Sequence, residues 1–201
     1  MTDRPTDSGN KKDGGEDQCL VVFRQVPVKG SNDRIIAWKV FQLMPGQTEI
    51  AFEVSSGMQL SITDEKGNLL DLQPVRTGQQ WAIVHDEAAC VVRQLQSKLD
   101  QKDVIQVSND TTEVVNVALY QLQKVLLRRN ELKPGEQIAF RLDANVYLGI
   151  YGPIQEGEEI DFRELKDYFV LSLIHGMTQV QLELTEDESR SWKIKSASVG
   201  K

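Results

Sequence analysis

The sequence contains little of what enzymes and metal sites usually need. Its 201 residues include only two histidines and two cysteines. It also lacks a Gly-x-Ser-x-Gly turn, a Gly-rich phosphate loop and a dinucleotide-binding glycine pattern. Catalytic groups can assemble from distant positions, so these absences alone do not exclude an enzyme. Together with the shortage of histidine and cysteine, they predict a protein that is not an enzyme and uses no cofactor.

Long hydrophobic runs are missing as well. The longest apolar run, from Tyr168 to Ile174, has the length of a β-strand, whereas a helix that crosses a membrane needs about 20 residues. The segment 2–18 has no apolar stretch of the kind that forms a secretory signal. We therefore expect a cytoplasmic protein with no membrane contact, in which Cys19 and Cys90 are buried thiols that behave as small hydrophobic residues. A bridge between them is the alternative, since the sequence does not supply the geometry of the pair.

Positive charge is in short supply. The chain has 23 Lys and Arg residues against 30 Asp and Glu residues, and its net charge is −7. Nucleic acids and anionic membranes attract proteins with a basic face. An acidic chain of this kind is therefore expected to bind neither.

Apolar side chains are scarcest in the first 18 residues. Between residues 2 and 18 there is no aliphatic or aromatic side chain. Such a segment cannot bury enough apolar surface to offset the entropy lost on ordering. Residues 1–18 are thus predicted to form a disordered polar tail, with structure starting at Cys19.

From Cys19 onward, the pattern is typical of antiparallel β-strands. Short apolar runs alternate with Gly-, Asn- and Pro-rich turns, and helical periodicity is rare. The clearest alternation lies at 178–184, where Val180, Leu182 and Leu184 occupy one face and polar residues occupy the other. Many short strands at this spacing predict an all-β protein built as an antiparallel β-sandwich or sandwiches.

One short pattern occurs twice. The string Leu-x-Pro-Gly followed by Ile-Ala-Phe ends at Phe52 and again at Phe140, 88 residues later. We interpret this echo as an internal duplication with one repeat at 19–99 and the other at 103–199, either as two sandwiches or packed as one continuous β domain. The alternative is that two unrelated strands share a Pro-Gly turn.

The second copy of this pattern resembles a known architecture over about 35 residues. The residues that carry the resemblance are Asn109, Thr111, the alternating Val115, Val117 and Leu119, then Leu132, Pro134, Gly135, Glu136 and Phe140. This combination is similar to the strand–turn signature of immunoglobulin-like sandwich modules. The resemblance implies a sandwich of immunoglobulin-like style and no specific activity.

Possible metal ligands are few. The densest group is His85, Asp86, Glu87 and Cys90. A zinc site needs three or four converging nitrogen or sulfur ligands, and this group has no second ligand pair. On a strand, adjacent side chains also point to opposite faces. We therefore predict no metal site.

A small-ligand site is the more specific alternative. Tyr147 and Tyr151 share a strand face opposite Val146, Leu148 and Ile150, so the two rings are expected to be exposed beside Asn145. Nearby, Glu159 and Asp161 fall on one face of a predicted strand at 158–162, where two carboxylates can bind a hard cation. Solvated acidic residues on an edge strand are the simpler interpretation of that segment.

The function that these patterns favour is a non-catalytic one. With no catalytic site visible, we expect a protein-interaction or self-assembly module that binds a protein partner, or another copy of itself, through a sheet face or an edge strand. The alternative is a binder of carbohydrate or a divalent cation through Tyr147, Tyr151, Asn145, Glu159 and Asp161.

Overall fold

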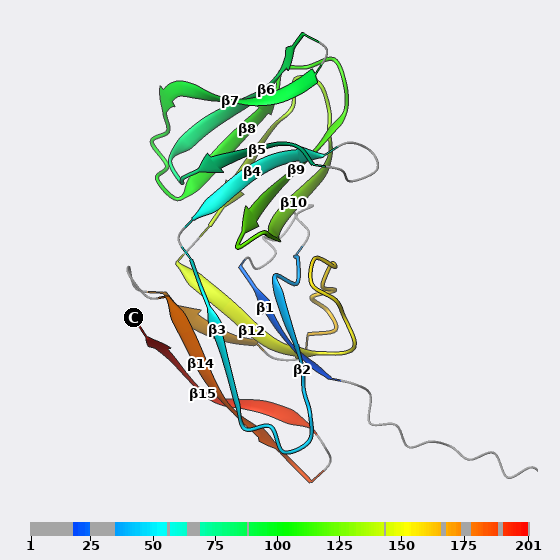
Figure 1. The fold of residues 1–201 in the computed structure, drawn as a ribbon, viewed down its shortest axis with the longest axis vertical. Coiled ribbons are helices and arrows are strands. Elements are labelled where there is room, and N and C mark those ends of the chain that lie inside the picture. Colours follow the sequence, from blue (N-terminus) through cyan, green and yellow to red (C-terminus); the bar gives the residue numbers. More distant parts are fainter. Residues whose placement is uncertain are drawn as a thin grey trace, which may run out of the picture.

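The computed structural model describes residues 18–24, 35–55, 57–63, 69–87, 89–142, 144–165, 168–173, 178–188 and 191–200. These residues form the strands β1 to β15 and contain no helix (Figure 1). The prediction of an all-β protein with antiparallel sheets packed as sandwiches is confirmed. The predicted polar tail lies, apart from Gln18, outside the described residues.

The strands nearest the two ends of the chain form one sandwich, which we call the terminal sandwich (Figure 1, lower half). One of its sheets has the order β13-β12-β1-β2 and the other has the order β15-β14-β3. The strands are β1 (Cys19–Phe23), β2 (Lys39–Gln42), β3 (Glu49–Glu53), β12 (Asn145–Tyr151), β13 (Tyr168–Ser172), β14 (Gln179–Glu186) and β15 (Trp192–Gly200).

The strands in the middle of the chain form the second sandwich, which we call the central sandwich (Figure 1, upper half). Its sheets have the orders β10-β9-β4-β5 and β11-β8-β6-β7, and the pairing of β6 with β8 is parallel. The strands are β4 (Met58–Thr63), β5 (Leu69–Val75), β6 (Gln79–Asp86), β7 (Ala89–Lys98), β8 (Val104–Asn109), β9 (Val115–Gln121), β10 (Lys124–Leu132) and β11 (Gln137–Arg141).

The alternating pattern of the sequence translates directly into buried and exposed faces. On β14, Val180, Leu182 and Leu184 are buried in the sandwich core, and the polar residues between them are exposed. β1 is different, because all five of its residues are buried. A strand buried on both faces requires a second layer on the outer side of its sheet, and this layer defines the candidate site below.

The sandwiches do not coincide with the segments 19–99 and 103–199. β1 pairs with β12, β3 with β14, β4 with β9 and β6 with β8, so every sheet combines strands from both segments. The chain leaves the terminal sandwich after β3, forms the whole central sandwich and returns at β12 (Figure 1). Alternation within a strand specifies its faces but not its neighbour, which explains the difference from the expected boundary.

The two sandwiches nevertheless correspond strand for strand over part of their length. In the sheet β13-β12-β1-β2, the first strand of the hairpin β12–β13 pairs with the first strand of the hairpin β1–β2. In the sheet β5-β4-β9-β10, the hairpins β4–β5 and β9–β10 pair in the same way. Phe52 and Phe140 are both buried and lie on the edge strands β3 and β11. Each of these strands follows a Pro-Gly turn with a left-handed glycine, Gly46 at φ 80° and Gly135 at φ 75°. β8 has no counterpart among the described strands of the terminal sandwich, and the duplication stays a prediction.

A buried glutamine joins the two sandwiches. The side-chain oxygen of Gln121, at the end of β9, accepts a hydrogen bond from Arg24 at 3.2 Å, and its amide donates to the backbone oxygen of Ser55. Its backbone oxygen accepts from the indole N–H of Trp38 at 3.3 Å. Arg24 and Trp38 belong to the terminal sandwich and Ser55 to the connection between β3 and β4, so these bonds span the junction.

Candidate functional site

The outer face of the sheet β13-β12-β1-β2 carries a second, smaller core. Cys19, Val21 and Phe23 of β1 point into it, opposite the side of the strand that faces β14. The segment between β12 and β13 covers this face, and we call residues 152–165 the cover segment. Buried residues of the cover segment, Ile160 and Leu165, complete the core.

Gly149 on β12 shows how closely the cover segment approaches the sheet. A β-carbon at this position would lie 2.5 Å from Cδ1 of Leu165 and 3.2 Å from its Cγ. Ordinary carbon–carbon contacts are about 3.5–4.0 Å. The Leu165 side chain therefore occupies the space that any larger residue at 149 would need.

Tyr147 belongs to this small core. Its side chain is only 8% exposed and stacks on Phe23, with ring centroids 5.5 Å apart and an interplanar angle of 17°. The expectation that the Tyr147 ring is exposed is wrong. The sequence places the residue on the correct face of β12, but only the cover segment determines that this face is shielded from water.

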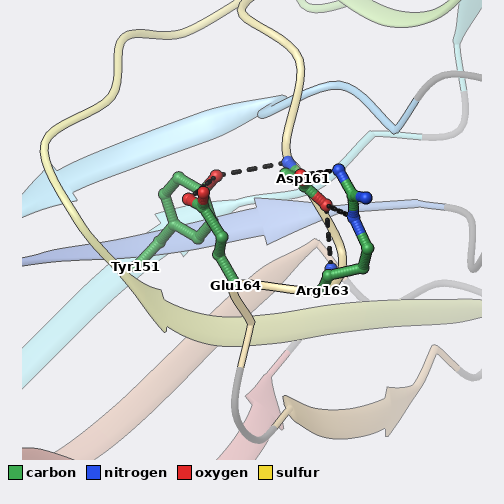
Figure 2. Close-up of polar contacts among 4 residues, drawn as sticks. All are labelled: Tyr151, Asp161, Arg163 and Glu164. Carbon is green, nitrogen blue, oxygen red and sulfur yellow. Dashed lines mark hydrogen bonds and ion pairs between the residues drawn. The ribbon is translucent and has the colours of Figure 1, made fainter.

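Tyr151 holds the cover segment in place (Figure 2). Its hydroxyl donates to Oε2 of Glu164 at 2.9 Å and accepts from the backbone N–H of Asp161 at 3.2 Å. Burial, followed by the hydrogen bond to Glu164, raises the pKa of the Tyr151 phenol. The hydroxyl is thus occupied by two bonds within the protein.

Asp161 forms a local ion pair rather than facing a shared carboxylate site. Its two oxygens bind the guanidinium of Arg163 at 2.9 and 2.5 Å, and Oδ1 also accepts the backbone N–H of Arg163 at 3.0 Å (Figure 2). The side-chain and backbone hydrogen bonds from Arg163 lower the pKa of Asp161 to about 2. The carboxylate is therefore ionised and already paired with a cation.

The remaining predicted site residues lie apart from this pair. Asn145 accepts a hydrogen bond from the Ser172 hydroxyl at 2.9 Å, at the other end of β12. Glu159 is exposed, and no strand forms at 158–162. This segment joins residues 35–37 through an isolated bridge between Glu159 and Ile36 and through backbone hydrogen bonds, such as the one from the Ile160 N–H to the Ile35 oxygen. The structure thus brings Tyr151 and Asp161 together but not the five residues as one surface. The ligand-site hypothesis stays a prediction.

The His85 and Cys90 pair lies on the β6–β7 hairpin, where the two residues face each other across the ladder. Sγ of Cys90 lies 3.8 Å from Nδ1 of His85. Burial and the charge of Glu113 raise the pKa of the Cys90 thiol, which opposes formation of the nucleophilic thiolate. No group of three or more histidine, cysteine or acidic residues that could hold a metal occurs among the described residues, and His175 lies outside them.

A more distinctive surface lies at the edge of the same sheet. β13 pairs with β12 on one side and has no strand on its other side in the described part of the chain. Tyr168, Phe169 and Val170 are large apolar residues on this strand and are 41%, 36% and 46% exposed. An exposed apolar edge of this kind is a template for pairing with another polypeptide.

The backbone groups that face away from β12 can be identified. Directly opposite residues of an antiparallel ladder alternate between hydrogen-bonded and non-hydrogen-bonded pairs. Just beyond the strand, the N–H of Leu173 donates to the oxygen of its opposite residue Ala144 at 2.6 Å. Since Leu173 is in a hydrogen-bonded pair, alternation puts Tyr168, Val170 and Ser172 in non-hydrogen-bonded pairs with β12. The N–H and C=O groups of these three residues therefore point outward, away from β12.

β13 also lacks the features that normally protect an edge. Its sequence, YFVLS, has neither a charged residue nor a proline, and every other edge strand of the described sheets has at least one. Protective residues on those strands are Lys39 on β2, Glu49 on β3, Asp71 and Pro74 on β5, Arg93 on β7, Arg128 on β10, Arg141 on β11 and Lys193 on β15. Charge and proline at edges prevent unwanted pairing, so their absence sets β13 apart.

The counterpart of β13 in the central sandwich is closed. β5 occupies the equivalent edge position, but it contacts β7 of the facing sheet. There, Oδ2 of Asp71 accepts the backbone N–H of Val92 at 2.9 Å. No comparable contact joins β13 to β15 among the described residues. The open edge is therefore specific to the terminal sandwich.

The sequence contained a partial signal for this edge. The run from Tyr168 to Ile174 is the longest apolar one in the chain, but it is equally typical of a central strand buried on both faces. Only the strand order shows that β13 lies at an edge. Sequence reasoning therefore favoured Tyr147 and Tyr151 and missed β13.

Comparison with known proteins provides no relative from which a function could be inferred. No protein-family model matches the chain, and no curated protein or solved structure matches it significantly. No helix with the length and apolar character needed to cross a membrane occurs in the described ranges. The chain's own surfaces are therefore the guide to its function.

Proposed function

We propose that this protein is a non-catalytic protein-interaction module that binds an extended segment of its partner along the edge strand β13. In this mode the partner adds a strand to the sheet β13-β12-β1-β2, and main-chain hydrogen bonds supply much of the affinity. The observation that carries the proposal is the unprotected apolar edge, with the backbone groups of Tyr168, Val170 and Ser172 directed outward.

The edge is well suited to binding because its first residue is held in place. The Tyr168 ring lies 5.4 Å from that of Phe162, 5.9 Å from Tyr147 and 6.4 Å from Phe23. These contacts anchor one face of β13 on the small core, while the backbone edge that faces away from β12 stays open. A preorganised strand loses less conformational freedom when a partner pairs with it, which favours affinity.

Selection from a displayed library of random peptides tests this function. The enriched peptides should be rich in β-branched and aromatic residues, and an enriched peptide should slow amide hydrogen exchange at Tyr168, Val170 and Ser172. The variant Val170→Lys adds a charge to the exposed edge and should weaken peptide binding by at least about tenfold.

The matched control is Leu72→Lys, because Leu72 is an exposed residue of the corresponding but closed edge strand β5. This variant should bind the peptide as the unmodified protein does. A library that yields no enriched peptide, or peptides whose binding is insensitive to Val170→Lys, would show that β13 is not a binding edge.

A further inference from the structure

The outward groups of β13 are arranged symmetrically about its central residue. Tyr168 and Ser172 lie two residues on either side of Val170, and all three direct their N–H and C=O groups away from β12. If a second β13 approaches antiparallel with Val170 opposite itself, Tyr168 of each copy faces Ser172 of the other. Every outward group then finds a hydrogen-bond partner, because these three positions form the hydrogen-bonded pairs of the new ladder.

The side chains agree with the same register. Phe169 of one copy would lie opposite Leu171 of the other on the face toward the sandwich core, and Val170 would meet Val170 on the outer face. Cross-strand pairs of apolar residues stabilise a sheet. No position in the register places a polar side chain against an apolar one except Tyr168 opposite Ser172.

Charge favours self-pairing of β13 over self-pairing of β3, the edge strand of the facing sheet. Each chain has a net charge of −7, so two copies already repel each other and a contact that adds no local charge repulsion is favoured. Self-pairing of β3 about Ala51 would set Glu49 opposite Glu53, and like charges opposite each other destabilise a ladder. Self-pairing of β13 brings no charged residues of the strand together.

We propose that two copies of this chain associate through antiparallel pairing of their β13 strands about a two-fold axis at Val170, which joins the sheets β13-β12-β1-β2 of the two copies into one. This inference rests on the proposed function, because it names the partner for the same edge. A two-fold contact of this kind is self-complementary and closes after two copies.

The contact is small, which places it among weak and transient interfaces. A strand of five residues is about 17 Å long. Its pairing and the three exposed apolar side chains bury less than the roughly 1,200 Å² that marks the lower limit of stable interfaces. We therefore expect a reversible dimer with a dissociation constant on the order of 10–100 µM.

Sedimentation equilibrium of the full chain from about 1 µM to about 1 mM tests the dimer, with that range bracketing the expected constant. The mass per particle should double across the range for the unmodified protein. For Val170→Lys the mass should stay that of one copy across the range. For the uncharged control Val170→Thr, and for Leu72→Lys on β5, the mass should double as it does for the unmodified protein. Val170 is about half exposed, so thermal unfolding of Val170→Lys should match that of Val170→Thr and confirm that the charged variant is folded.

Disulfide trapping tests the register. In a chain with Cys90→Ser, the added variant Val170→Cys should form a disulfide between copies, since hydrogen-bonded pairs have Cα atoms about 5.5 Å apart, within the range for a disulfide. Tyr168→Cys in the same background should not, because position 168 faces position 172. A chain that dimerises equally well with Val170→Lys, or that cross-links equally well through either position, would overturn the two-fold β13 pairing.

The outcomes separate this inference from the proposed function. If the chain stays monomeric at 1 mM, roughly ten times the weakest expected constant, the second copy is not the partner. In that case, library peptides that still bind at β13 would leave the proposed function in place. If neither a dimer nor a peptide complex forms, both proposals fail.

Discussion

Replacing Gly149 with alanine tests whether the cover segment packs tightly on the sheet. The new β-carbon would lie 2.5 Å from Cδ1 of Leu165, about 1 Å closer than an ordinary contact. Leu165 is buried, so its side chain must rotate or the cover segment must lift. Overpacking of this kind costs about 1–3 kcal/mol.

Two effects set the net change. Alanine restricts the unfolded chain more than glycine does, which returns about 0.5–1 kcal/mol. We therefore expect Gly149→Ala to lower the free energy of unfolding by about 1 kcal/mol, within a range of about 0–2.5 kcal/mol, which is the overpacking cost less this return. In a chain of this size, each kcal/mol lowers Tm by about 2–4 °C.

Urea unfolding measures the loss, and a double-mutant cycle identifies its cause. Leu165→Ala removes the atoms that the new β-carbon would meet, so in this background Gly149→Ala should become neutral or stabilising by up to about 1 kcal/mol. The matched control is Gly152→Ala, since no atom lies within 4 Å of a β-carbon built at Gly152 and its φ is not positive.

Either of two results would show that the cover segment is not packed tightly on the sheet. One is a Gly149→Ala variant as stable as Gly152→Ala. The other is a Gly149→Ala cost that is unchanged when Leu165 is alanine, because additivity would mean that the two side chains do not meet.

Two further predictions concern polar groups of the cover segment and of the junction between the sandwiches. The pKa of the Asp161 carboxyl, followed by NMR, should be about 2 and should rise toward 3.8 in Arg163→Gln; because the folded-state pKa is lowered, the stabilisation is complete above pH 3.8 and is lost as the pH falls through 2. Gln121→Ala removes the bonds to Arg24 and Ser55 at the junction and should lower the free energy of unfolding by about 2 kcal/mol in urea titrations. A Gln121→Ala variant with an unchanged unfolding midpoint would show that these bonds do not stabilise the junction.

The strands and their buried faces could be predicted because alternation is a local property. The positions of Val180, Leu182 and Leu184 follow from a period of two residues, and the core positions of Phe52 and Phe140 follow in the same way. The Pro-Gly echo likewise marks two turns, and in the structure both glycines, Gly46 and Gly135, have the positive φ that glycine adopts without steric cost.

The candidate site was harder to predict because it depends on what covers each face. Tyr147 and Tyr151 share a face of β12, as expected, yet one is a core residue and the other binds the cover segment. Glu159 and Asp161 were expected on one strand, but the segment makes turns, and Asp161 pairs with Arg163. Local alternation carries no information about a layer contributed by a distant or irregular segment.

Strand pairing is the property that depends on the whole chain. The local pattern determines that Tyr168–Ser172 is a strand and which of its side chains share a face, since these follow from neighbouring residues. Only the tertiary structure decides that β1 lies between β2 and β12 and that β13 lies at an edge, because partners are selected by contacts between residues far apart in sequence. The open edge, and with it the proposed function, is therefore a consequence of long-range pairing.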